Sequence, residues 1–104
     1  MEINSLNVTQ LRNGLLKGDF SPKEILDSTI NKIHEIDNNI NAFPIRCFEK
    51  AYKQIEELPS IKDIDFETHP LYGIPVGVKD LNDIKGVLTT QGSELFRGYL
   101  PKAD

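Results

Sequence analysis

The feature that most constrains the fold is a change of pattern at Pro70. Before it, apolar side chains recur at the three- and four-residue spacing of amphipathic helices. After it this periodicity stops, and residues 74–81 read as a β-strand among dense glycine, proline and valine. One strand, or two, cannot make a stable sheet in water, and each helix needs a partner for its apolar stripe. We therefore expect the N-terminal part of a larger α/β protein.

The first predicted helix has recognisable signals at both ends. Asn7 and Gln10 have the spacing of a capping box, and Gly18 is a typical residue to end a helix. Gly14 should weaken the helix, because glycine is a poor helix former. The apolar residues that recur at helical spacing are Val8, Leu11 and Leu15.

The second predicted helix has the clearest start in the chain. Ser21 is a good N-cap, Pro22 fits the first helical position, and Glu24 can close a capping box. The run Asp37-Asn38-Asn39 should end it. A third helix is expected over residues 48–58, before a proline.

Composition excludes several classes of function. The net charge is −4, and no Lys/Arg cluster could form a phosphate-binding stripe, so no nucleic-acid partner is expected. The N-terminus has no basic start followed by an apolar run, and no apolar stretch is long enough to span a membrane. Cys47 is the single cysteine, expected to be small and buried, and it cannot form an internal disulfide. We expect a cytoplasmic protein with no membrane partner.

The predicted strand places a lysine in an unusual setting. Alternate residues of a strand face opposite sides, so one face is apolar and should be core, while the other carries Gly77 and Lys79. Gly77 costs strand stability, which suggests that a backbone or ligand comes close there. Burial disfavours the charged form of a lysine, so a confined Lys79 could act as a general base. Spacing alone also allows a surface lysine whose stem covers apolar area. The face predicted to be core consists of Ile74, Val76, Val78 and Asp80, and Pro75 shares the other face with Gly77 and Lys79.

The segment from Pro70 to Ser93 resembles the first signature block of the amidase signature family. That family shows a Pro-Leu-x-Gly-Ile-Pro run, then Val-Lys-Asp, a glycine, a Thr-Thr pair and a Gly-Ser. Asn41-Ala42-Phe43, after an amphipathic helix, also matches the family's N-terminal layout, so the resemblance covers most of the chain. The matching residues are Pro70, Leu71, Gly73, Ile74, Pro75, Val78, Lys79, Asp80, Gly86, Thr89, Thr90, Gly92 and Ser93.

The resemblance implies the family's α/β fold, a mixed sheet flanked by helices. The chain would be an incomplete part of a single amidase domain. Within it, residues 7–58 would be helical, residues 59–69 a loop, and residues 70–104 the signature strand region.

The resemblance also implies amide-bond hydrolysis by a serine–cis-serine–lysine triad, with no cofactor and no metal. Lys79 aligns with the family lysine, which takes a proton through a bridging serine while the other serine attacks the amide carbonyl and forms an acyl-enzyme. The family's two serines lie in a glycine- and serine-rich loop, and no such run occurs in these 104 residues. This segment alone should therefore be inactive. Its expected partners are the remainder of the amidase domain, a small-molecule amide and, in the full-length protein, a second copy in a homodimer.

Other reactive residues lack a supporting pattern. Ser93 does not stand in a Gly-x-Ser-x-Gly motif, and a structural or capping role is expected. Thr89 and Thr90 are expected near the site, bonded to the loop that carries the serines. His34 and His69 have no cysteine or paired-acid spacing that would make a zinc site.

Two alternatives stay open. The glutaminase subunit of a tRNA-dependent amidotransferase shares the signature, and its partners would be the other subunits and charged tRNA. That subunit more often differs after the Lys-Asp pair, where this chain has Leu81, and at Gly92-Ser93, so the residues favour the hydrolase. The other alternative is a non-catalytic helical interaction module, whose binding faces would be the apolar stripes of its helices.

Overall fold

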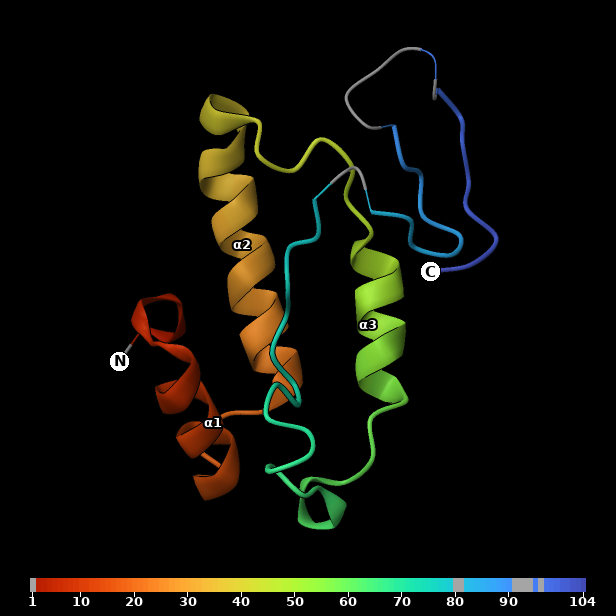
Figure 1. Ribbon diagram of the computed structural model, residues 1–104. Helices are drawn as coiled ribbons and strands as arrows, with labels where there is room; N and C mark the ends of the chain where they lie inside the picture. The colour runs from red at the N-terminus through yellow and green to blue at the C-terminus, as the bar shows by residue number, and fades with distance from the viewer. Residues whose placement is uncertain (1, 80–81, 91–94, 96) are drawn as a thin grey trace. The chain divides into compact units, whose positions relative to one another are not determined.

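The computed structural model describes residues 2–79, 82–90, 95 and 97–104 (Figure 1). These residues form three α-helices and two short 3-10 turns. The structure divides into two compact units, which we call the helical unit (Met1–Phe43 and Phe48–Pro75) and the C-terminal unit (Pro44–Cys47 and Val76–Asp104). The helices are α1 (Val8–Lys17), α2 (Pro22–Ile40) and α3 (Phe48–Glu56), and the 3-10 turns are Ile3–Ser5 and Ile61–Asp63.

Helix α1 confirms the predicted capping box and helix end. The Asn7 side chain accepts from the Gln10 backbone N–H and the Gln10 side chain accepts from the Asn7 N–H, both at 2.9 Å. Gly18 ends the helix with a left-handed φ of 77°. Gly14 has a packing role that its poor helix propensity does not predict. A Cβ at this position would lie 2.2 Å from Cζ of Phe20. Its missing side chain makes room for the phenyl ring.

Helix α2 begins as predicted. The Ser21 hydroxyl accepts from the Glu24 backbone N–H at 3.2 Å, and Pro22 occupies the first turn. The capping box closes differently, since the Ser21 hydroxyl donates to the Glu24 carboxylate at 3.4 Å. Helix α3 also lies within the predicted range, although it ends at Glu56.

The end of α2 lies beyond the asparagines that were predicted to stop it. The helix continues to Ile40, and Asn41 takes the left-handed conformation with φ 57°. Asp37, which is buried, accepts through its carboxylate from the backbone N–H groups of Ala42 at 2.7 Å and Phe43 at 3.2 Å. The side chain of Asp37 therefore caps the residues that follow the helix, which ends one residue after Asn39.

The apolar core of the described residues lies in the helical unit, and α2 supplies most of it. Helix α2 also contacts α3 and the first 3-10 turn, where the Asn4 side chain donates to the Ser28 carbonyl at 3.1 Å. None of the helices in the described part of the chain is long and apolar enough to cross a membrane. The buried apolar residues are Leu15, Ile25, Leu26 and Ile30.

A charged cluster joins α2 to α3. The Asp27 carboxylate accepts a hydrogen bond from the Tyr52 hydroxyl and pairs with the Lys23 ammonium at 2.9 Å. These two donors, Tyr52 first and Lys23 second, hold the pKa of Asp27 below its usual value. The same hydrogen bond raises the pKa of Tyr52, because the phenol loses a favourable contact when it ionises. Lys23 also lies 5.8 Å from the centre of the Tyr52 ring.

The predicted α/β fold, a mixed sheet flanked by helices, is wrong for the residues that the structure describes. They are helical and contain no strand, and residues 74–79 have irregular backbone. An isolated antiparallel bridge between Ile84 and Val87 stands outside any strand. A strand exists only where a neighbour pairs with its N–H and C=O groups, and Pro75 has no N–H to give. The residue types of this segment favour a strand, but no pairing partner lies beside it among the described residues.

Backbone hydrogen bonds outside any strand connect two segments of the C-terminal unit. The Gly86 N–H donates to the Pro101 carbonyl at 2.9 Å, and the Thr89 N–H donates to the Tyr99 carbonyl at 3.1 Å. The partners run in opposite order along the chain, as in an antiparallel pair. The Tyr99 hydroxyl donates to the Asp83 carboxylate at 3.1 Å, and this bond raises the pKa of Tyr99.

Candidate active site

The signature segment begins with a turn in the helical unit. The Ile74 N–H donates to the Leu71 carbonyl at 3.0 Å, and the Tyr72 N–H donates to the His69 carbonyl at 3.2 Å. Gly73, the third residue of the first of these turns, has φ +73°, a value that side chains rarely adopt. The glycine of the signature therefore has a conformational reason to be glycine.

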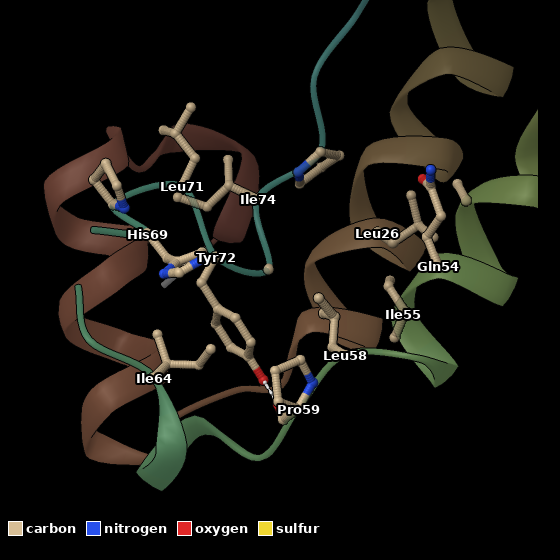
Figure 2. Close-up of a pocket in the computed structure, with 14 residues that line it drawn as sticks. Leu26, Gln54, Ile55, Leu58, Pro59, Ile64, His69, Leu71, Tyr72 and Ile74 are labelled. Atoms are coloured by element: carbon tan, nitrogen blue, oxygen red, sulfur yellow. Dashed lines mark hydrogen bonds between the residues drawn. The ribbon is translucent and has the colours of Figure 1, made fainter. Parts of the chain in front are cut away.

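An open groove of about 640 Å³ lies beside this turn, within the helical unit (Figure 2). Apolar side chains make most of its wall, and Gln54, His69 and Tyr72 add polar atoms. The Tyr72 side chain reaches down to Pro59, whose carbonyl accepts from the tyrosine hydroxyl at 2.6 Å. The other lining residues are Leu26, Ala51, Ile55, Leu58, Pro59, Ile64, Pro70, Leu71, Gly73, Ile74 and Pro75.

Lys79, the predicted catalytic base, lies in the C-terminal unit with an exposed side chain. Its carbonyl accepts from the Asn82 N–H at 3.1 Å. The face predicted to be core is largely open, because Val76 is 68% and Val78 51% exposed, while Ile74 is half-buried. Among the described residues, the Lys79 side chain is therefore open to solvent, and its catalytic role stays a prediction.

The threonines of the signature belong to the same unit as Lys79. Thr89 is only 2% exposed, and its hydroxyl donates to the Val87 carbonyl at 3.1 Å. Its backbone N–H is bonded to Tyr99, as described above, so its visible bonds lie within the C-terminal unit. Gly92 and Ser93, with the predicted capping role of Ser93, lie outside the described residues.

The remaining reactive side chains have separate surroundings. The rings of His34 and Phe48 form a T-shaped pair with centres 5.6 Å apart. His69 forms a hydrogen bond of 2.9 Å with the Thr68 hydroxyl. Cys47 is exposed, so the prediction that it is buried is wrong. No group of three metal-ligating side chains occurs in the part of the chain that the structure describes.

The structure gives two side chains a function that the sequence does not predict. The sequence predicts only a helix stop at Asp37, yet its buried carboxylate accepts from two backbone N–H groups. Tyr72 stands at the variable position of the Pro-Leu-x-Gly-Ile-Pro run, and its hydroxyl fastens that run to Pro59. The position of Tyr72 directly before a turn glycine was a sequence signal for its role. No local sequence pattern indicated the role of Asp37.

Comparison with protein families identifies the class. The Amidase family model matches residues 24–104, so the chain belongs to the amidase family, as the signature predicted. No solved structure matches the chain.

The chain is also similar to the A subunit of glutamyl-tRNA(Gln) amidotransferases. The protein of that name from Natranaerobius thermophilus is 33% identical over 97% of the chain and 21% of the relative. The one from Wolbachia sp. subsp. Brugia malayi is 38% identical over 96% of the chain and 20% of the relative. The chain therefore spans about one fifth of the length of these relatives.

Proposed function

We propose that this chain supplies Lys79 as the general base of an enzyme that cleaves carboxylic amides through an acyl-serine intermediate. The observation that carries the proposal is the match of residues 24–104 to the amidase family, within which Lys79 stands in the Val-Lys-Asp position of the signature. The same proposal includes a small-molecule amide as substrate and a cytoplasmic location. Its partners are the remainder of the amidase domain and a second copy in a homodimer.

The proposed reaction moves one proton from the nucleophilic serine to Lys79 and later returns a proton to the leaving nitrogen. Neutral Lys79 takes a proton from a bridging serine, which takes one from the nucleophilic serine as its oxygen attacks the amide carbon. The C–N bond of the tetrahedral intermediate then breaks, the nitrogen leaves with a proton as ammonia or amine, and water hydrolyses the acyl-serine. Both serines must come from residues other than these 104, because the chain has no glycine- and serine-rich run.

The exposure of Lys79 adds a requirement to this proposal. A lysine is a base only when neutral, and removal from water favours the neutral form. The Lys79 side chain is exposed in this chain. The residues that bring the serines must therefore also cover Lys79.

Replacement of the lysine tests the proposal. In the protein expressed from its own gene, Lys79→Ala should slow acyl-enzyme formation by about 10²–10⁴-fold, the usual contribution of a general base. The measurement is hydroxylamine trapping of the acyl group, with propionamide and glutamine as probe amides. Lys102→Ala removes another lysine of the C-terminal unit and should leave the rate unchanged. Near-normal turnover in Lys79→Ala, with the fold intact by circular dichroism, would refute the assignment.

A second candidate is the glutaminase subunit of a tRNA-dependent amidotransferase. The relatives named above favour it, whereas Leu81 and the Gly92-Ser93 pair favour a stand-alone hydrolase. An amidotransferase subunit should copurify with partner subunits, release ammonia from glutamine and pass it to glutamyl-tRNA. A stand-alone hydrolase should act on propionamide without partners. Absence of turnover with every probe and partner would instead favour the non-catalytic interaction module.

A further inference from the structure

The open groove of the helical unit has one wall from α3 and another from the start of the signature segment (Figure 2). We propose that this groove binds apolar side chains from the remaining part of the same amidase domain. This inference rests on the proposed function only where it takes the chain as one portion of such a domain, and it adds the surface through which that portion joins the rest.

The first wall is the apolar face of α3 and of the turn that follows it. Ala51, Ile55 and Leu58 stand at i, i+4 and i+7, so they share one helical face. The Leu58 N–H donates to the Ile55 carbonyl at 3.1 Å, which continues this course beyond Glu56. An amphipathic helix normally buries such a stripe. Here α3 contacts α2, yet it has no buried residue and these three side chains are only half-buried. The stripe therefore still offers apolar area to a further surface.

The second wall consists of signature residues. All six residues from 70 to 75 line the groove, and every one except Tyr72 matches the family pattern. Leu71 is 52% exposed, so an apolar side chain of the signature lies open to water at this wall. A wall that members of the family share suits an occupant that they also share. That occupant is the amidase domain itself, rather than a partner peculiar to this chain.

The chemistry of the lining favours apolar side chains over a polar ligand. The described lining residues include no lysine, arginine, aspartate or glutamate. A small-molecule site usually combines apolar walls with a few polar groups directed at the ligand. Two of the three polar side chains here are already bonded to the chain itself, Tyr72 to the Pro59 carbonyl and His69 to the Thr68 hydroxyl. What the groove mainly offers is apolar contact area.

The relatives have enough further chain to supply the occupant. The relative from Natranaerobius thermophilus is matched over 21% of its length, so about four fifths of it lies outside the matched region. Contiguous exposed apolar surface commonly marks a place that another protein surface covers. A segment of the same polypeptide reaches the groove at high effective concentration, whereas a second copy must be recruited from solution. The same domain is therefore the favoured occupant.

The two histidines of the chain provide a direct test, because both are exposed and only His69 lines the groove. The protein expressed from its own gene is treated with diethyl pyrocarbonate, folded and in urea, and modification is followed by peptide mass. His69 should react roughly tenfold more slowly in the folded protein than in the unfolded protein, since a covered side chain reacts only after local opening. His34, the control outside the groove, should keep a rate within about twofold of its unfolded rate.

Two leucines of the helical unit provide a second measurement. Leu71 and Leu16 are 52% and 56% exposed, and only Leu71 lines the groove. In the same protein, Leu71→Gln should lower Tm by about 3 °C or more, because it places an amide in a covered apolar contact. Leu16→Gln is the matched control and should change Tm by less than about 1 °C, since glutamine is a good helix former at an open position.

Each outcome decides the proposal. Modification of His69 at its unfolded rate, equal protection of both histidines, or equal losses of Tm in the two leucine variants would overturn it. Protection of His69 that disappears on dilution would identify a second copy as the occupant and also overturn it. If Leu71→Gln does not fold, the labelling of the unchanged protein still decides. A protected His69 beside an active Lys79→Ala refutes the proposed function alone, whereas a reactive His69 beside an inactive Lys79→Ala refutes only this inference.

Discussion

The two units of this chain hold themselves together by different means. The helical unit contains the buried apolar residues of the described structure, Leu15, Ile25, Leu26 and Ile30, and each helix satisfies its own backbone internally. The C-terminal unit, in its described part, relies on a few backbone hydrogen bonds, a tyrosine–carboxylate pair and the buried side chains of Thr89 and Pro101. The comparison teaches that the family signature crosses from one unit to the other. Its first residues pack within the helical unit, whereas Lys79 lies in the C-terminal unit with an exposed side chain.

The largest expected effect contrasts buried and open apolar residues. Ile25→Ala in α2 should lower the free energy of unfolding by about 2–5 kcal/mol, because Ile25 is 1% exposed and the change leaves a cavity. Val78→Ala in the C-terminal unit should cost less than about 0.5 kcal/mol, as expected for an open side chain. Chemical denaturation of the protein expressed from its own gene measures both. A cost for Val78→Ala near that of Ile25→Ala would break the comparison and mean that further residues bury Val78.

Two glycines with the same backbone conformation sharpen the role of the turn. Gly18→Ala should cost about 1–2 kcal/mol, because its φ is +77° but no atom lies within 4 Å of the added methyl group. Gly73→Ala has the same φ cost and should lose about 1–3 kcal/mol more through its contacts with Pro22 and Leu15. Thermal unfolding of the two variants provides the measurement. Equal losses would mean that the turn does not pack against the helices.

Buried polar groups provide a third contrast. Asp37→Asn should destabilise the protein by about 1–3 kcal/mol, because the amide cannot accept from both Ala42 and Phe43 without turning its NH₂ group toward one of them. Thr89→Val in the C-terminal unit loses one hydroxyl bond and should cost about 0.5–1.5 kcal/mol. Urea denaturation measures both changes. A larger loss for Thr89→Val would reverse the ranking of the two units.

The smallest effects concern two tyrosines, one in each unit. Tyr52 and Tyr99 both have a pKa above the ordinary 10.0, because each donates to a carboxylate that its ionisation would repel. A raised folded-state pKa stabilises the fold below pH 10.0 and stops doing so as the pH rises through the folded value. Ultraviolet titration should show that Asp27→Asn returns the pKa of Tyr52 toward its ordinary value and leaves that of Tyr99 unchanged. Asp83→Asn should do the reverse, and a shift of both tyrosines by either change would show that the units are electrostatically coupled.

The sequence predicted the helices because their determinants are local. The capping residues Asn7 and Ser21, and the left-handed Gly18, act on neighbours within one turn. The boundary at Ile40 was missed since it depends on Asn41 and on the carboxylate of Asp37, which reaches out from inside the helix to the residues beyond its end. The family could be recognised because its signature is a long run of residues in a fixed order.

Tertiary structure decided the rest, for physical reasons. A strand pattern at residues 74–79 cannot show whether a partner pairs with it, and no pairing occurs there in the described structure. Alternation predicted a buried face where Val76 and Val78 are open, because burial depends on what packs against a face and not on its composition. The chain by itself determined its helices, its family and the position of Lys79 in the signature. Only the folded contacts revealed how Tyr72 and Gly73 pack within the helical unit, since Pro59, Pro22 and Leu15 are distant from them in sequence.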